Sequence, residues 1–230
     1  KPVLVLDMDE TMIWARLPTN ETANLMRDRI DPNELRYFDT KSTNRWVLKR
    51  PELLPFLREM RKHYRIFVWT AGTQSYADPI LDWIEEDDSF FEKRFFRDSC
   101  TEINSGQYVK YLGNLGEDLS RVLILDNNED AYLFNKANGV PIVDFEGNMQ
   151  DRELLGTYMK VLRTASDFDD VRHGIALFAE LKDCVAKKRR LVSTFLHIGI
   201  LLFKDEMIVT YLSFTLPIHN GAGFGRFARR

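Results

Sequence analysis

Three short apolar runs, each followed at once by a polar residue, constrain the fold of this chain more than any other feature. The runs are Val3–Leu6, Ile66–Trp69 and Val122–Leu125. The polar residues that follow them are Asp7, Thr70 and Asp126. Apolar runs of this length without alternation are typical of strands buried on both faces of a parallel sheet. A fourth run, Val140–Val143, ends at Asp144 and predicts one more strand.

Helical patterns separate these runs. The sequence predicts helices over 51–64, 74–86, 130–137, 151–165 and 169–187. Pro79 lies inside the second pattern, where we expect a break or kink. Strands that alternate with helices indicate an α/β fold with a mainly parallel sheet. Because such folds bind ligands beyond the carboxyl ends of their strands, we expect the polar residues after the runs to lie at one site.

The length of 230 residues allows one good core with a small insertion. Residues 14–45 are polar and rich in turn formers until a strand-like Arg45–Leu48, and a long excursion after a first strand is typical of a functional flap. We expect one domain over 1–186, with this flap, and an extension of unknown role over 187–230. The longest apolar run, Leu191–Phe203, is too short to span a bilayer and predicts a buried helix.

Composition excludes several classes of protein. A net charge of −3 argues against a general nucleic-acid binder, since such binders carry a surplus of Lys and Arg. The two cysteines, Cys100 and Cys184, cannot form a disulfide framework, and no Cys/His cluster has zinc-ligand spacing. We therefore expect a reducing, intracellular setting.

Two carboxylates at positions i and i+2, Asp7 and Asp9, leave the first predicted strand. They can converge on one site if the backbone turns immediately afterwards. A carboxylate nucleophile suits phosphoryl transfer because it divides the displacement into two steps. A neighbouring acid can protonate the departing oxygen and later activate water.

The other predicted strand ends add matching chemistry. Thr70-Ala71-Gly72-Thr73 offers a hydroxyl and backbone N–H groups in a tight turn, which is a natural phosphate cradle. Lys110 can supply a fixed cation for phosphoryl oxygens. Asp126-Asn127 offers hard oxygen ligands of the kind that Mg²⁺ prefers.

These motifs together resemble the haloacid dehalogenase superfamily. Within it they are similar to the phosphatases that act on the C-terminal domain of RNA polymerase II, the small CTD phosphatase and Dullard-like group. The resemblance runs from Val3 to Val171 and rests on five segments, Val5–Thr11, Trp69–Thr73 with Tyr76–Pro79, Phe96–Cys100, Val109-Lys110 and Leu125–Asn127. It implies a Rossmannoid parallel sheet flanked by helices.

The resemblance also implies roles for single residues. Asp7 would be the nucleophile and Asp9 the general acid and base. The residues implied in binding phosphate or substrate are Thr11, Thr70, Ala71, Tyr76, Arg97 and Lys110. The ligands implied for Mg²⁺ are Asp7, the Asp9 backbone carbonyl, Asp126 and Asn127. Thr73 departs from the family pattern, because an apolar residue is typical of that position in the small CTD phosphatases.

The function that follows is a Mg²⁺-dependent serine/threonine phosphatase. Its substrate would be the polymerase tail or another phosphoprotein, in the nucleus or cytoplasm. The alternative is a mitochondrial inner-membrane import receptor, which has this fold and acts by binding. Phe96–Asp98, Asn138–Val140 and Asp169–Arg172 resemble that receptor as well. Retention of the acidic motif favours the enzyme.

Two features near the carboxyl end resemble functional motifs but also fit an ordinary helix. Cys184 and Arg190 have the spacing of cysteine-dependent phosphatases, but no glycine or serine between them could form a phosphate loop. Lys187–Arg190 fits either a nuclear localisation patch or the cations of a helix C-terminus.

Overall fold

The computed structural model describes residues 1–19, 31, 33–40, 43–86, 88–104 and 106–180. The chain divides into two compact units, residues 1–182 and 183–230. The expectations for Cys184 with Arg190, for the basic run 187–190, for the apolar run 191–203 and for the extension 187–230 lie outside the described residues.

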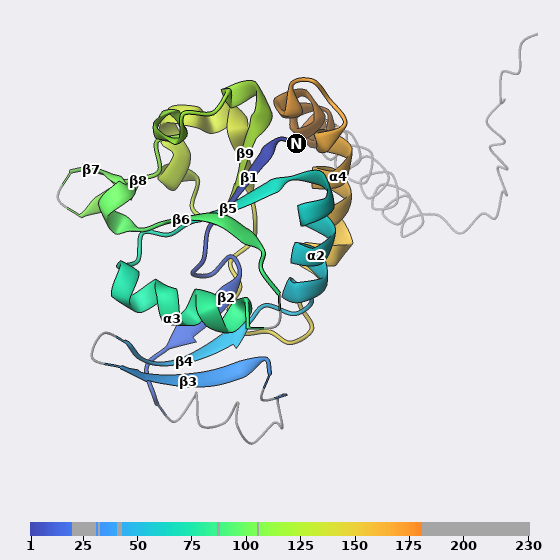
Figure 1. Cartoon of the computed structure of the whole chain (residues 1–230). Helices are drawn as coiled ribbons and strands as arrows, with labels where there is room; N and C mark the ends of the chain where they lie inside the picture. The colour runs from blue at the N-terminus through green and yellow to red at the C-terminus, as the bar shows by residue number, and fades with distance from the viewer. Residues whose placement is uncertain (20–30, 32, 41–42, 87, 105, 181–230) are drawn as a thin grey trace, which may run out of the picture. The chain divides into compact units, whose positions relative to one another are not determined.

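A five-stranded parallel sheet forms the centre of the first unit (Figure 1). Its strands are β1 (Val3–Leu6), β5 (Arg65–Trp69), β6 (Phe91–Phe95), β9 (Val122–Asp126) and β10 (Gly139–Pro141). They lie in the order β10-β9-β1-β5-β6. The α/β fold with a parallel sheet is thus confirmed. The charged sequence of β6 hid this strand from sequence analysis, because an edge strand need not be continuously apolar.

The two faces of the sheet bury alternate residues of the central strands. Leu4, Leu6 and Leu125 face the larger core, which also contains apolar residues of the helices. Val5 and Ile124 face a smaller core on the other side. A strand directs successive side chains to opposite faces, so uninterrupted apolar runs are needed where both faces are covered.

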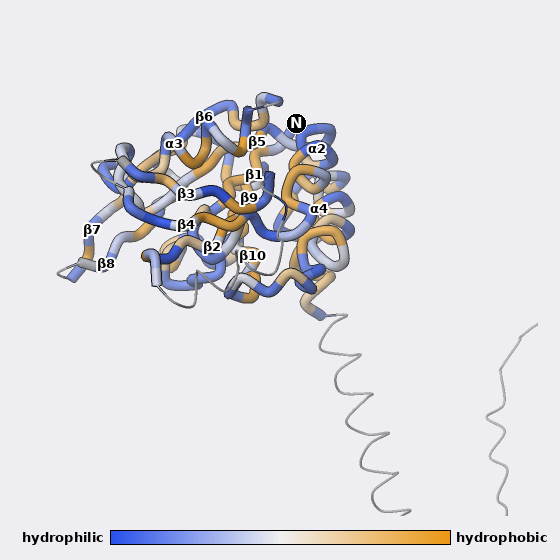
Figure 2. The backbone as a smooth tube through the Cα atoms, turned by 90° about the horizontal axis from the view of Figure 1, so that it is seen from below, coloured by the Kyte–Doolittle hydropathy of each residue, from blue (hydrophilic) through white to orange (hydrophobic). Residues whose placement is uncertain are grey.

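The helices partly match the expected ranges. The α-helices are α2 (Leu53–His63), α3 (Gln74–Ile84) and α4 (Met159–Ser166). Of the break or kink expected at Pro79, the break is wrong, because α3 runs through this residue as one helix. Residues 171–180 are helical as far as the description extends. The tube changes between orange and blue along α2 and α4, as expected for helices with one buried side (Figure 2).

Two of the expected helices are irregular. The segment predicted as a short helix over 130–137 is η4 (Glu129–Asn138), a 3₁₀ segment with non-helical φ/ψ at Tyr132 and Asn135. The helix predicted over 151–165 begins with a π-helical turn, η5 (Leu154–Tyr158), before α4. Shorter 3₁₀ turns are η1 (Arg97–Ser99), η2 (Leu112–Leu115) and η3 (Leu119–Arg121).

The excursion after β1 contains an antiparallel sheet, which we call the flap sheet. It consists of β2 (Ile13–Arg16), β3 (Leu35–Thr40) and β4 (Thr43–Lys49), in the order β2-β4-β3. Phe38 of β3 packs against Trp83 of α3 with ring centroids 5.7 Å apart. The strand expected over 45–48 is part of β4, whereas β2 and β3 were not expected.

A short hairpin, β7 (Thr101–Ile103) and β8 (Gln107–Val109), leads directly to Lys110. No helix within the described part of the chain is long and apolar enough to cross a bilayer.

Candidate active site

The polar residues after the three central strands meet at one edge of the sheet. Strands β5 and β9 both pair with β1 in parallel register, so Leu6 lies beside Val68 and Leu125. The chain beyond β1 continues this arrangement, since the Asp7 N–H donates to the carbonyl of Leu125 at 3.0 Å. Sheet topology therefore places Asp7 next to Asp126, although 118 other residues separate them in the sequence.

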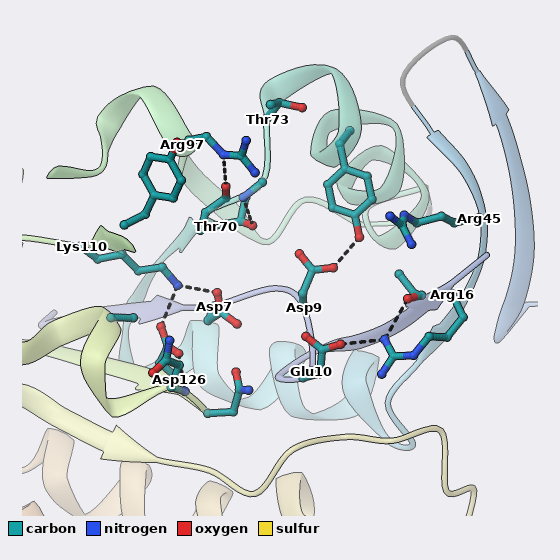
Figure 3. A pocket seen from close by; sticks show the side chains of 18 residues that line it. Asp7, Asp9, Glu10, Arg16, Arg45, Thr70, Thr73, Arg97, Lys110 and Asp126 are labelled. Atoms are coloured by element: carbon teal, nitrogen blue, oxygen red, sulfur yellow. Dashed lines mark hydrogen bonds and ion pairs between the residues drawn. The ribbon is translucent and has the colours of Figure 1, made fainter. Parts of the chain in front are cut away.

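The backbone turns immediately after Asp7, as the proposed convergence requires. The N–H groups of Met12 and Ile13 both donate to the Met8 carbonyl, at 2.9 and 3.1 Å. Glu10 has a φ of 57°, the left-handed conformation that tight turns often use. Figure 3 shows the outcome, with the carboxylates of Asp7 and Asp9 both facing the same space.

Lys110 joins Asp7, which follows β1, to Asp126, the last residue of β9. Its Nζ donates to Oδ1 of Asp7 and to Oδ2 of Asp126, the latter at 2.7 Å (Figure 3). The residues are only 2%, 7% and 1% exposed, respectively. The Lys110 N–H donates to the Ala131 carbonyl at 2.6 Å, which anchors the lysine backbone. An ammonium has three donors, so one remains for a ligand.

Burial controls the protonation of this cluster. Burial, and then the charge of Asp126, raise the pKa of Asp7 to about 7, against the opposing effect of Lys110. Burial disfavours the Lys110 ammonium, but the charges of Asp7 and Asp126 outweigh it and raise the lysine pKa. The lysine is therefore a fixed cation at neutral pH.

Tyr76 holds the second aspartate of the motif. Its hydroxyl, on helix α3, donates to Oδ1 of Asp9 (Figure 3). Burial raises the pKa of Asp9, while the hydrogen bond from Tyr76 works in the opposite direction. A partly buried carboxyl whose pKa is raised is suited to giving and taking a proton.

The turn after β5 supplies a hydroxyl and a close approach of the backbone. The Gly72 N–H donates to Oγ1 of Thr70 at 2.9 Å, so the threonine hydroxyl keeps its own hydrogen for a ligand. A Cβ at Gly72 would lie 2.8 Å from Cδ1 of Tyr76. Arg97 lines the cavity beside this turn. Its Nε donates to the Ala71 carbonyl at 2.6 Å, and its guanidinium lies over the Tyr108 ring.

Thr11 differs from its expected role in binding phosphate or substrate. It is fully buried and does not line the cavity. Its Oγ1 donates to Oδ1 of Asn127 at 3.0 Å and accepts from the Asn127 N–H at 3.2 Å. Asn127 also donates to Oδ1 of Asp144 at 3.1 Å. Thr11 therefore positions Asn127 from below.

The remaining predicted residues line one cavity of about 580 Å³. They are Asp7, Asp9, Thr70, Ala71, Tyr76, Arg97, Lys110, Asp126 and Asn127. Sequence analysis missed Arg16 and Arg45, which reach the cavity from the flap sheet, and Tyr108 (Figure 3). Thr73, noted as a departure from the family pattern, lines it as well.

The donors around Asp7 fit a magnesium ion. Side-chain oxygens come from Asp7, Asp126 and Asn127, which all line the cavity. The backbone carbonyl of Asp9 belongs to the turn that follows Asp7. The described residues hold no group of three or more His, Cys, Asp or Glu side chains arranged as a metal cage. Mg²⁺ does not need one, since it is usually held by one or two carboxylates and keeps several waters. Asp7 and Asp126 place two carboxylates beside the single ammonium of Lys110, so a further cation would be compensated there.

A family model described as NLI interacting factor-like phosphatase matches residues 2–172. The chain belongs to this family. The NLI interacting factor-like phosphatase match covers the described sheet and every residue assigned to the cavity. Recognition of the family from the acidic motif and the later strand ends is confirmed.

Curated relatives of this NLI interacting factor-like chain include human carboxy-terminal domain RNA polymerase II polypeptide A small phosphatase 1. The two are 39% identical over 155 residues, 67% of this chain and 56% of the relative. Nuclear envelope morphology protein 1 of Schizosaccharomyces pombe is 31% identical over 173 residues, 74% of this chain and 35% of the relative. The chain spans about half the length of the first of these relatives and a third of the second.

Solved structures of the RNA polymerase II CTD phosphatase Fcp1 share the fold. A fission yeast Fcp1 bound to beryllium fluoride matches with a TM-score of 0.53 and 23% identity, over 80% of this chain and 56% of that chain. Because the identity is only 23%, this similarity is evidence for the fold of the chain alone.

Proposed function

We propose that this chain is a Mg²⁺-dependent phosphatase of phosphoserine or phosphothreonine in proteins, with Asp7 as its nucleophile. The observation that carries the proposal is the bridge from Lys110 to both Asp7 and Asp126, beside an Asp9 that Tyr76 orients. The nucleophile and the acid leave β1 two residues apart, the cation follows β8, and all three face one cavity. Family membership supports the same reaction class.

In the first step, a carboxylate oxygen of Asp7 attacks the phosphorus atom. The bond from phosphorus to the serine or threonine oxygen breaks, and Asp9 gives its proton to that oxygen. The third donor of Lys110 and the hydroxyl of Thr70 bind phosphoryl oxygens as charge shifts onto them. The products are a free hydroxyl side chain and an acyl phosphate on Asp7, the aspartyl-phosphate intermediate.

In the second step, a water molecule attacks the phosphorus of the Asp7 phosphate. Asp9, now ionised, takes a proton from this water, and the bond between phosphorus and the Asp7 oxygen breaks. Inorganic phosphate leaves, and both aspartates return to their initial states. The same carboxyl thus acts first as an acid and then as a base.

The Mg²⁺ ion would be held by Asp7, the Asp9 carbonyl, Asp126 and Asn127. When bound, it neutralises negative charge on the phosphoryl oxygens and on the carboxylates that hold it. The hydrogen bonds from Thr11 and to Asp144 fix the Asn127 amide, which is the kind of outer support that ligands usually have.

We propose a phosphorylated protein segment as the substrate, and we expect no direct binding of nucleic acid. The polymerase tail is one candidate, since it appears in the names of relatives. The intracellular setting, nuclear or cytoplasmic, stays a prediction. The alternative, an import receptor that acts by binding, does not require the complete acidic cluster that surrounds Lys110.

The test is hydrolysis of an aryl phosphate and of phosphoserine peptides by the purified chain, with Mg²⁺ or with a chelator. Asp7→Asn should abolish turnover and keep the circular dichroism spectrum, while Asp39→Asn, an exposed acid of the flap sheet, serves as the matched control. Mass spectrometry of the quenched wild type should find phosphate on Asp7. Normal turnover by a folded Asp7→Asn protein would refute the assignment.

A further inference from the structure

Arg45 is a cation of the cavity to which the proposed reaction gives no role. It lies on β4 of the flap sheet, opposite Phe38 of β3, and is half-buried. Its guanidinium lies beside the pair formed by Tyr76 and Asp9, on the far side from Lys110 (Figure 3). The flap sheet therefore carries positive charge to the edge of the acidic motif.

The neighbouring arginines already have partners, and this separates Arg45 from them. Arg16 forms an ion pair with Glu10 at 2.8 Å. Arg97 donates to the Ala71 carbonyl and stacks over Tyr108. Within the described ranges, no carboxylate lies at ion-pair distance from Arg45, which acts on Asp9 and Tyr76 only through its charge.

A half-buried guanidinium without a carboxylate is poorly compensated, because burial removes part of its hydration. Arginine is well suited to bind phosphate and carboxylate, since its planar fork of donors matches two oxygens at once. An anion at Arg45 would supply the missing partner. The charge of the side chain and its place in the cavity both point to a ligand.

The ligand at Arg45 is distinct from the phosphoryl group that reacts. Lys110 and Thr70 bind that group beside Asp7, whereas Asp9 and Tyr76 lie between it and Arg45 (Figure 3). Asp9 gives its proton to the leaving oxygen, so Arg45 lies on the side where the rest of the substrate must extend. The volume of about 580 Å³ leaves room for more than a phosphoryl group.

The surroundings of Arg45 are polar. Glu10, Arg16 and Thr73 line the same cavity, and its apolar side chains are small ones, Ala15, Ala71 and Ala131. Arg16 pairs with Glu10, whereas Arg45 has no carboxylate partner among the residues that the structure describes. A peptide with a charged neighbour fits such a surface better than one with an apolar neighbour.

We propose that Arg45 determines substrate specificity by binding a second anionic group, a phosphate or a carboxylate, on a residue near the phosphorylated one. The inference rests on the proposed phosphatase activity and names the substrate class within it, which is a peptide that carries clustered phosphates or acids. Arg45 contacts the substrate but takes no part in the bond changes.

The experiment measures kcat/KM of the whole chain with Mg²⁺ on four sets of phosphoserine peptides. The four sets carry phosphoserine, glutamate, glutamine or alanine at one position near the reacting phosphoserine. Within each set, this position is moved along the peptide on both sides of the reacting residue. The readout is the ratio between each charged peptide and its glutamine counterpart within one enzyme, because this ratio cancels any change in overall activity. The enzymes compared are wild type, Arg45→Gln, Arg45→Lys and Arg36→Gln.

Arg36 is the matched control because it is also a flap-sheet arginine but pairs with Glu86, outside the cavity. Wild type and Arg36→Gln should prefer a charged neighbour by about tenfold at one or more positions. Arg45→Gln should reduce the ratio to near one, and Arg45→Lys should retain part of it. Comparison of the phosphoserine and glutamate peptides tells which anion the site prefers.

Two results would overturn this inference. One is a wild type that hydrolyses the peptides with no preference for charge, and the other is a preference that persists in Arg45→Gln. Failure of the proposed function has a different signature, since the wild type would then hydrolyse neither the peptides nor an aryl phosphate. The two failures are therefore distinguishable in one series of measurements.

Discussion

The hydroxyl of Tyr76 donates a hydrogen bond to Oδ1 of Asp9, and so ties helix α3 to the turn that follows β1. The bond fixes the orientation of a side chain that would otherwise be free to rotate. Because it occupies one carboxyl oxygen, it leaves Oδ2 for the proton that Asp9 exchanges. The tyrosine thus positions the proposed acid without having to touch the substrate.

Tyr76→Phe should lower kcat on phosphoserine peptides by about ten- to a hundredfold, a part of what general acid catalysis contributes. The loss should be much smaller for an aryl phosphate with an acidic phenol, because that leaving group departs without a proton. The measurement is kcat for both substrates. Asp9→Asn provides the reference, with the same pattern and a larger loss on the peptide.

Equal losses on both substrates in Tyr76→Phe would contradict a role through Asp9. They would instead indicate that the ring itself shapes the cavity. The phenylalanine keeps the ring and removes only the hydroxyl, so the comparison isolates the hydrogen bond.

Gly72→Ala should also impair proton transfer by Asp9, because it displaces the Tyr76 ring. The new Cβ would lie 2.8 Å from Cδ1 of Tyr76 and 3.1 Å from Oγ1 of Thr70, so the ring must move away from Asp9. We expect a loss of kcat similar to that of Tyr76→Phe, and a double variant little worse than either single one. Gly156→Ala is the control, because nothing lies within 4 Å of its Cβ position.

Arg50 and Asp151 form a buried ion pair that should dominate stability near the site. Arg50 is fully buried and binds both Asp151 carboxyl oxygens, at 2.8 and 3.1 Å, as well as the carbonyls of Thr11 and Val143. Asp151→Ala leaves this guanidinium without its charge partner and should cost about 3–5 kcal/mol in the free energy of unfolding. Urea denaturation measures this loss.

The control for Asp151→Ala is Glu86→Ala, which removes the partner of Arg36 at the surface. Exposed pairs contribute at most about 1 kcal/mol, so the midpoint should hardly change. An equally small loss in the free energy of unfolding in both variants would show that other groups stabilise the Arg50 charge when Asp151 is removed.

Asp7→Asn should change how the stability of the metal-free protein depends on pH. Folding raises the pKa of Asp7 from an ordinary value of 3.8 to about 7, chiefly through burial, so the folded state holds the proton more tightly. The wild type therefore loses stability as pH rises from about 4 to 7. Asparagine resembles the protonated form and does not titrate.

In a chelator, the stability of Asp7→Asn relative to wild type should increase from pH 5 to pH 8. Urea denaturation at the two values measures the difference. A constant difference would mean that Asp7 stays ionised throughout, with Lys110 as the dominant influence.

The strands that carry the chemistry could be predicted because burial on both faces demands uninterrupted apolar runs. Parallel pairing then forces Asp7, Thr70 and Asp126 to one edge, whatever lies between them in the sequence. Their meeting point follows from topology alone. Lys110 was found from its residue type and from family resemblance, because nothing local to the hairpin indicates which cavity it faces.

The flap sheet could not be predicted in the same way. The strand β3 has the sequence Leu-Arg-Tyr-Phe-Asp-Thr, without regular alternation, and its Phe38 packs against Trp83 of α3, which is distant in the sequence. The place of Arg45 in the cavity follows from its register opposite Phe38, which the sequence does not reveal. The place of Thr11 outside the cavity lining could not be predicted for a related reason, since its motif does not show which way its hydroxyl points.

The bond between Lys110 and Asp7 joins residues 103 positions apart, and the ammonium that both aspartates share exists only when β1, β8 and β9 are all in place. We therefore expect a fragment that lacks any one of these strands to have no phosphatase activity. On the proposed mechanism, we expect no turnover during synthesis until β9 has paired with β1. In a denaturant titration, turnover should disappear together with the sheet, so an assay of turnover would also report the fraction of molecules that are folded.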